Sequence, residues 1–103
     1  MNVFVANAGA VNLCPTGDTA EELDVDGVVV SPAALADRTE YALVGVKNKA
    51  VLATFDGSAP VSSAAGVYYA AGNYVWSRSM VASAKLIEAV AANEAVVRFE
   101  PMN

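Results

Sequence analysis

The fold is decided by the stretch YALVGVKNKAVLATF, residues 41–55. Two runs rich in β-branched and aromatic residues, Tyr41–Lys47 and Ala50–Phe55, lie on either side of Asn48-Lys49. Runs of this kind favour strands. Asn tolerates the left-handed backbone conformation that a tight turn requires. The stretch therefore predicts a β-hairpin.

The rest of the chain repeats this pattern. Gly, Pro, Asn and Asp break it at the spacing expected for the turns of an all-β domain. The runs between them predict further strands at Val3–Ala6, Val11–Cys14, Val28–Ser31, Val67–Ala70 and Tyr74–Ser77. No repeat or linker divides the 103 residues, a length that suits one small domain. We expect a single β domain over residues 1–103.

Residues 79–94 are ambiguous. Their Ala, Leu, Lys and Glu content favours a helix. The alternative is two strands, Lys85–Ala91 and Ala95–Glu100, because Val97 and Phe99 alternate with charged residues as a half-buried strand does. The residues alone leave both interpretations open.

The composition excludes several protein classes. The chain is 55% hydrophobic and 17% charged, against about 25% charged in an average domain, so it is too apolar to be disordered. No apolar run reaches the roughly 18 residues of a membrane span. The start, Met1-Asn2-Val3-Phe4-Val5, lacks the basic and apolar regions of a signal peptide. We expect neither a membrane span nor a signal peptide.

The net charge of −5 comes from one segment. Residues 18–26 hold five acids and no base, whereas the acids and bases of the remaining chain balance. The six Lys and Arg residues are scattered singly. Without a basic patch, nucleic-acid binding is not expected.

The acidic segment partly matches a calcium loop. Glu22, Asp24, Asp26 and Gly27 have the spacing of the first half of an EF-hand loop, but the final position, which needs a bidentate Glu, is Ala33. We therefore favour a solvated acidic loop over a looser cation site. The sequence Thr-Ala-Glu-Glu at 19–22 is also compatible with a capping box that opens one helical turn.

The residues needed for catalysis are missing from the sequence. It has no His, and Cys14 is its single cysteine, so neither an intrachain disulfide nor a thiolate metal cluster can form. No nucleophile motif or glycine-rich phosphate loop is present. We expect no enzyme activity, no cofactor and no metal. Cys14 is expected to be a small buried hydrophobic residue of a protein made in a reducing compartment.

Four aromatic residues within nine positions suggest a protein interface. Tyr68 and Tyr69 are adjacent, so on a strand they cannot both face the core. On the next strand Tyr74 and Trp76 share one face. Either one ring is in the core and one tyrosine lies along the surface, or a partner buries them, since Tyr and Trp are enriched at interface hot spots. These four are the candidate interface residues.

Two runs are apolar on both faces of the expected strand. They are Tyr41–Val46 and Val28–Val30. Small antiparallel domains usually expose one sheet face to water. Such runs indicate either the middle of a tight sandwich or burial against another chain, and they favour a component of an assembly.

Residues 41–100 resemble small virion proteins of tailed bacteriophages. The resemblance rests on the stretch 49–73, in which Phe-Asp-Gly-Ser-Ala-Pro at 55–60 ends a strand. A loop of small residues, Gly66, a short strand and Ala-Ala-Gly at 70–72 follow. A final hairpin pairing Leu86–Ala91 with Val96–Glu100 would close the domain.

The resemblance implies a compact antiparallel β-sandwich, jelly-roll-like, with at most one short helical turn. It also implies a capsid decoration (cement) protein, or else a neck or tail accessory component. The implied partners are the major capsid protein or copies of this chain, in a homo-oligomer or bound to the lattice. The implied location is the virion, after synthesis in the host cytoplasm. A free module that binds carbohydrate or host surfaces remains a third class.

Overall fold

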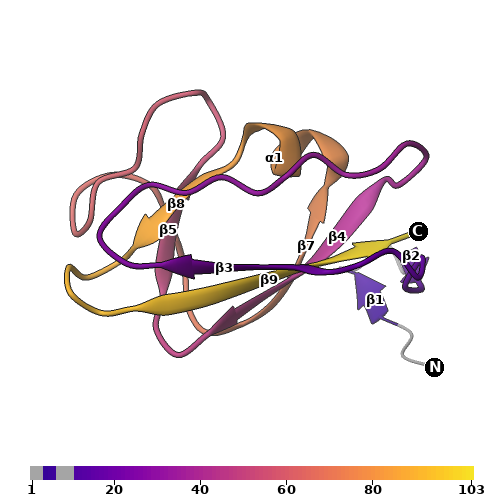
Figure 1. Ribbon diagram of the computed structural model, residues 1–103, viewed down its shortest axis with the longest axis horizontal. Helices are drawn as coiled ribbons and strands as arrows, with labels where there is room; N and C mark the ends of the chain where they lie inside the picture. The colour runs from indigo at the N-terminus through magenta and orange to yellow at the C-terminus, as the bar shows by residue number, and fades with distance from the viewer. Residues whose placement is uncertain (1–3, 7–10) are drawn as a thin grey trace.

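The computed structural model describes residues 4–6 and 11–103, which form short strands and one helix (Figure 1). The expected strand Val3–Ala6 is observed from Phe4, and Val3 lies outside the described residues. The strands are β1 (Phe4–Ala6), β2 (Val11–Leu13), β3 (Glu21–Val25), β4 (Tyr41–Lys47), β5 (Val51–Thr54), β6 (Val67–Tyr69), β7 (Gly72–Ser77), β8 (Lys85–Glu88) and β9 (Ala95–Met102), and the helix is α1 (Arg78–Ser83).

Two antiparallel sheets pack face to face. The four-stranded sheet has the order β3-β9-β4-β7, and the three-stranded sheet has the order β6-β5-β8. Their inner faces share one core, to which α1 also contributes. Its buried residues are Val25, Ala42, Val44, Val46, Val51, Ala53, Trp76, Val81, Ala84, Leu86, Ala95, Val97 and Phe99.

The chain alternates between the sheets as in a jelly roll. Each of the connections β4–β5, β6–β7 and β8–β9 passes from one sheet to the other. β8 is an edge strand, and a single isolated bridge pairs Leu86 on its free edge with Val30. This bridge occupies the position of an eighth strand in a two-sheet jelly roll. The expected all-β, jelly-roll-like sandwich is confirmed.

Both predicted hairpins are wrong, although the strands themselves exist. β4 pairs with β7 and β9, whereas β5 pairs with β6 and β8. The turn between β4 and β5 has the expected left-handed residue, Asn48 at φ 72°, but it joins the two sheets. In the same way β8 and β9 lie in different sheets. Turn chemistry identifies where the chain reverses, but not which strand it then pairs with.

The acidic segment forms a strand. β3 pairs with β9, and Leu23 and Val25 face the core while Glu22 and Asp24 face outward. The helical turn expected at 19–22 is therefore wrong, and so is the loop over residues 21–25; residues 18–20 and 26 lie outside the strand, and Asp18, Glu22, Asp24 and Asp26 are exposed as expected. An edge strand tolerates outward acids because only one of its faces must be apolar.

The run Val28–Ser31 is not a strand. Only Val30 pairs across to β8, while Val28 and Val29 are exposed, at 62% and 40%. Residues 31–36 continue as irregular chain that crosses in front of the sheets (Figure 1).

The ambiguous segment contains both a helix and a strand. Ser77 caps α1 by accepting a hydrogen bond from the Met80 amide at 3.3 Å. The helix stops after six residues because Ala84 is extended (φ −68°, ψ 136°) and leads into β8. β8 is shorter than the expected Lys85–Ala91, and a turn over residues 89–92 follows it.

Both apolar faces of β4 pack against other residues of this chain. Ala42, Val44 and Val46 point into the core. On the other face Tyr41 and Leu43 pack with Val75 against buried Leu13 and Met102. Backbone hydrogen bonds of 3.0 Å between Cys14 and Asn103, in both directions, hold β2 beside the end of β9. β2 thus contributes to covering this part of the outer face.

No helix in the described part of the chain combines the length and apolar character that crossing a membrane requires.

Candidate functional site

The four candidate aromatic residues have different environments. Trp76 is 1% exposed, Tyr69 and Tyr74 are half-buried, and Tyr68 is 64% exposed. The register explains the split, since Tyr68 lies opposite Leu52 on the outer face whereas Tyr69 lies opposite Val51 on the inner face. Of the four, Tyr68 offers the most surface to a partner, and Trp76 offers almost none.

Trp76 organises an aromatic cluster in the core. Its ring meets Phe55 at a centroid distance of 5.1 Å and Tyr69 at 5.3 Å, both edge-to-face. Tyr69 in turn meets Tyr74 at 4.9 Å. Edge-to-face pairs of this kind stabilise a core beyond their buried area. The Trp76 indole N–H is buried and has no hydrogen bond of standard geometry, although its interaction with the Tyr69 hydroxyl slightly opposes the rise in the pKa of Tyr69.

The hydroxyl groups of the two half-buried tyrosines have different surroundings. Desolvation of the Tyr69 hydroxyl, with a smaller contribution from neighbouring Tyr74, raises the pKa of Tyr69. The Tyr74 hydroxyl donates to the Ala70 carbonyl at 2.8 Å. The Tyr69 hydroxyl is therefore neutral at physiological pH.

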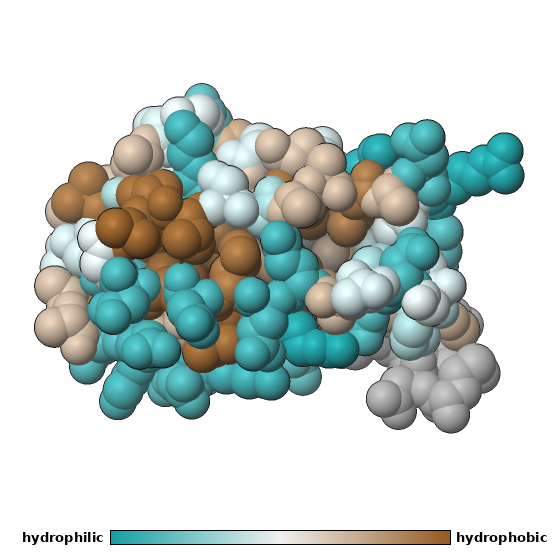
Figure 2. Space-filling model, in the orientation of Figure 1, coloured by the Kyte–Doolittle hydropathy of each residue, from teal (hydrophilic) through white to brown (hydrophobic). Residues whose placement is uncertain are grey.

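An exposed apolar surface lies at one end of the molecule. Figure 2 shows a hydrophobic patch over β8 and the segment that follows β3. Among the residues whose burial the structure describes, the exposed large hydrophobic side chains are Val28, Val29, Val61, Val67, Tyr68 and Val90. Sequence reasoning found Tyr68 and the two-faced run Val28–Val30, but it missed Val61, Val67 and Val90, because single valines beside turns carry no periodic signal.

A hollow of about 370 Å³ lies on the outer side of the three-stranded sheet, within this end. Leu52, which is 8% exposed, and Ala89 are the buried members of its lining. Tyr68, Val90 and the turn Ser63–Gly66 complete the lining. Its walls are mostly apolar, as in sites that accept an apolar group.

Glu88 is a buried acid that the sequence did not single out. It is 2% exposed on β8, and its Oε2 accepts a hydrogen bond from the Gly27 amide at 2.9 Å. Its backbone carbonyl accepts from Ser62 Oγ at 2.8 Å. Glu88 therefore ties both the segment after β3 and the turn before β6 to the three-stranded sheet.

The acidic side chains of the segment are not gathered into a cluster. Within residues 4–6 and 11–103, no three His, Cys, Asp or Glu side chains lie close enough to hold a metal ion. Glu22 pairs with Lys47 at 3.7 Å, with both side chains exposed. Glu21 Oε1 accepts from the Ala33 amide at 2.8 Å. Of the EF-hand match, Glu22 and Asp24 lie on β3, and Asp26 and Gly27 follow its end.

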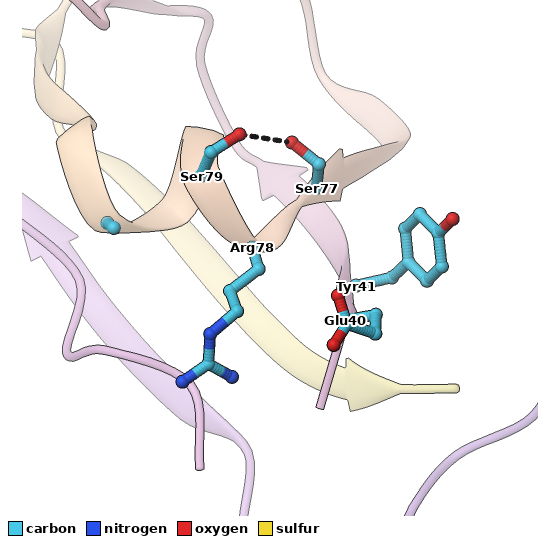
Figure 3. Close-up of a pocket in the computed structure, with 6 residues that line it drawn as sticks. Glu40, Tyr41, Ser77, Arg78 and Ser79 are labelled. Atoms are coloured by element: carbon cyan, nitrogen blue, oxygen red, sulfur yellow. Dashed lines mark hydrogen bonds between the residues drawn. The ribbon is translucent and has the colours of Figure 1, made fainter. Parts of the chain in front are cut away.

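A second hollow, of about 470 Å³, lies beside α1. Figure 3 shows Glu40, Tyr41 and the hydrogen-bonded pair Ser77–Ser79 around it, with the Arg78 guanidinium pointing away from that pair. Arg78 donates to the carbonyls of Ala36 at 2.8 Å and Thr39 at 2.7 Å. Its guanidinium is thus used to hold the loop before β4.

Comparisons with protein-family models, with curated proteins and with solved structures find no match for this chain. The resemblance to bacteriophage virion proteins therefore stays a prediction.

Proposed function

We propose that this protein is a non-enzymatic virion structural protein, a capsid decoration protein that binds the assembled shell and stabilises it. The observation that carries the proposal is the mostly apolar 370 Å³ hollow, with exposed Tyr68 and Val90 in its lining. Exposed apolar surface gathered in one place on a small domain is typical of a site of protein contact. Tyr68, at 64% exposure, supplies an aromatic anchor of the type enriched at interfaces.

The fold supports the same class of function by analogy. Jelly rolls recur in viral capsid proteins and in lectins. Fold analogy alone does not assign a function. It gives weight to two candidates, a virion component and, second, a carbohydrate-binding module in which the exposed Tyr68 ring would stack on a sugar.

The proposed mechanism is adhesive. A protein that binds the assembled lattice, but not its free subunits, adds its binding free energy to the stability of the shell by mass action. Each copy would bury an interface of roughly 800 Å² on each partner. The partners would be the major capsid protein, neighbouring copies of this chain, or both.

The test is the copy number of this chain in gradient-purified particles, measured by quantitative peptide mass spectrometry against the major shell protein. Copies in proportion to the shell lattice are expected for a decoration protein. A small fixed number of copies at one vertex would indicate a neck or tail accessory role instead of a decoration role. Absence from particles would contradict a virion role and leave the free binding module.

A further inference from the structure

The longest free edge of the two main sheets belongs to β7. This strand pairs with β4 on one side, and no strand in the described part of the chain lies on its other side. In an antiparallel pair, alternate residues turn their N–H and C=O groups toward the neighbouring strand. The Arg78 amide donates to the Glu40 carbonyl at 2.7 Å, which continues the β4–β7 ladder and fixes this alternation. The β7 residues turned away from β4 are therefore Asn73, Val75 and Ser77.

Pro101 gives the same assignment from the other side of β4. It lies opposite Ala42, but it has no N–H, and its carbonyl accepts from the Thr16 amide at 3.1 Å. Ala42 is therefore not hydrogen-bonded to β9, and its N–H and C=O groups turn toward its other neighbour, Trp76 of β7. This places Trp76 on the paired side of β7 and Val75 on the free side.

The groups on the free side have no hydrogen-bond partner in the described part of the chain. Neither the strand ladders nor the turns and loops supply one to the N–H and C=O of Asn73 and Val75, or to the Ser77 N–H. Ser77 is the N-cap of α1, so its own carbonyl accepts within the helix. Backbone groups of this kind are satisfied by water or by another chain.

The other three edges of the two sheets are protected. β3 carries Glu21, Glu22 and Asp24 among its five residues. β8 has Val30 bridged to its free edge, and β6 is only three residues long. Charges, covering segments and short strands are the usual means by which an edge avoids pairing with another chain. β7 has none of them, because Gly72–Ser77 is six residues long and includes no charge and no proline.

The charged side chains around β7 leave its free edge open. Lys47, beside the start of β7, reaches across β9 to Glu22 at 3.7 Å. Arg78, at the other end, donates to two carbonyls of the loop before β4, and Glu40 beside it is exposed. Antiparallel pairing of two copies would set the end with Lys47 and Lys49 in one copy beside the end with Glu40 in the other. Opposite charges at matching ends favour association.

The free edge of β7 is also complementary to itself. An unused donor, the Ser77 N–H, lies two residues after Val75, and an unused acceptor, the Asn73 C=O, lies two residues before it. Reversing the strand about Val75 therefore brings donors onto acceptors. β3 lacks this property, because its reversal would place like charges opposite each other, which is destabilising.

We propose that β7 is the edge through which two copies of this chain associate, with their β7 strands antiparallel about a two-fold axis and Val75 opposite Val75 of the second copy. Each Val75 amide donates to the carbonyl of the other Val75, and each Ser77 amide donates to the Asn73 carbonyl of the other copy. The two four-stranded sheets become one continuous sheet. A two-fold contact needs only one such self-complementary surface. The inference goes beyond the proposed function, because it concerns the free protein and holds whether or not the chain binds a shell.

Amide hydrogen exchange of the full chain, followed by NMR at increasing protein concentration, tests the register. The Val75 and Ser77 amides should exchange at least tenfold more slowly as the dimer forms, because both become hydrogen-bonded. The Asn73 amide should stay fast, since the Ser77 carbonyl that it would meet is used within α1. Sedimentation velocity on the same samples should show the mass of a dimer, which dissociates on dilution.

Proline at matched edge positions tests the surface. Val75→Pro removes an N–H that has no partner within the described chain, a position at which an edge strand tolerates proline, and it should weaken the dimer at least tenfold. Asp24→Pro makes the same change on the free edge of β3, where residue 24 is also turned away from its neighbour β9, and should leave association unchanged. Val75→Thr keeps the N–H and should dimerise as the wild type does. If Val75→Pro does not fold, the exchange pattern of the wild type still tests the contact.

Several results would overturn the inference. They are a wild-type monomer at every concentration, a dimer that protects the Asn73 amide or the Tyr68 amide of β6 in place of Ser77, or equal weakening by Asp24→Pro and Val75→Pro. A monomer whose binding to purified particles is lost in Val75→Pro would assign this edge to a shell protein instead of a second copy. A dimer that does not bind particles would contradict the decoration role and leave the β7 contact standing.

Discussion

The outer faces of the two sheets differ. On the four-stranded sheet, the apolar end formed by Tyr41, Leu43 and Val75 packs against Leu13 and Met102 of the same chain. The other end is polar, with a shallow hollow lined in part by Lys47 and Arg98. On the three-stranded sheet, the turn over residues 61–66 leaves an apolar hollow with an exposed rim. The chain therefore covers the apolar part of one outer face and leaves that of the other exposed.

The largest expected effect comes from the core that both sheets share. Trp76→Ala should destabilise the domain by about 3–5 kcal/mol, because it removes a buried ring and leaves a cavity. Small domains have only about 5–15 kcal/mol of stability. The variant should therefore unfold at a clearly lower denaturant concentration than the wild type. Chemical denaturation followed by circular dichroism measures this.

Tyr68→Ala is the matched aromatic control. Its ring is exposed, so stability should change by less than about 0.5 kcal/mol. If Trp76→Ala were as stable as Tyr68→Ala, the buried Trp76 ring would contribute nothing to the core that the two sheets share.

The next largest losses of stability are expected from two buried leucines on the outer faces, Leu13 and Leu52. Leu13→Ala should cost about 3 kcal/mol, because Leu13 is 1% exposed and covers Tyr41 and Leu43. Leu52→Ala should cost about 2 kcal/mol, because the space it leaves opens into a hollow that solvent already reaches. Urea denaturation of both variants checks the order. A larger loss for Leu52→Ala would mean that the three-stranded face is the better sealed of the two.

Glu88 anchors the segment after β3 to the edge strand β8 through its hydrogen bond with the Gly27 amide. Glu88→Ala should cost about 1–3 kcal/mol, because the Gly27 amide loses its buried acceptor. Faster hydrogen exchange of the Gly27 and Val30 amides should accompany this loss. Glu88→Gln keeps an acceptor oxygen and is expected to behave closer to wild type. Equal losses in the two variants would show that the negative charge, and not the hydrogen bond, matters at this position.

The smallest effect concerns Asp56, in the loop between β5 and β6. Hydrogen bonds from the Ser58 side chain and amide lower the pKa of Asp56 below its ordinary value of 3.8. A lowered folded-state pKa stabilises the fold above the unfolded-state value, and this contribution is lost as the pH falls through the folded-state pKa.

Ser58→Ala should raise the Asp56 pKa toward 3.8 and flatten this acid dependence. A carboxyl NMR titration measures the shift. Ser79→Ala, a serine in α1 far along the chain, is the control. An unchanged Asp56 pKa in Ser58→Ala would show that the Ser58 hydroxyl does not set it.

Local patterns predicted several elements well. Tyr41–Lys47 is β4 as expected, and the left-handed Asn48 follows it. The alternation in Ala95–Glu100 is observed in β9, which extends to Met102. These features depend on neighbouring residues only, so they can be read from composition and alternation. The alternation of Leu23 and Val25 with acids was also a strand signal, but the density of charge obscured it.

The candidate site was only partly predictable. The sequence by itself indicated an all-β domain, localised its acidic charge and required that Tyr68 and Tyr69 point in opposite directions. Only the tertiary structure decided which tyrosine is exposed, that Trp76 is core, and that the turn 61–66 and Val90 form a hollow with Leu52. The reason is that jelly-roll strands pair with partners distant in sequence, as β3 does with β9. Burial is set by those partners, and a local pattern carries no information about them.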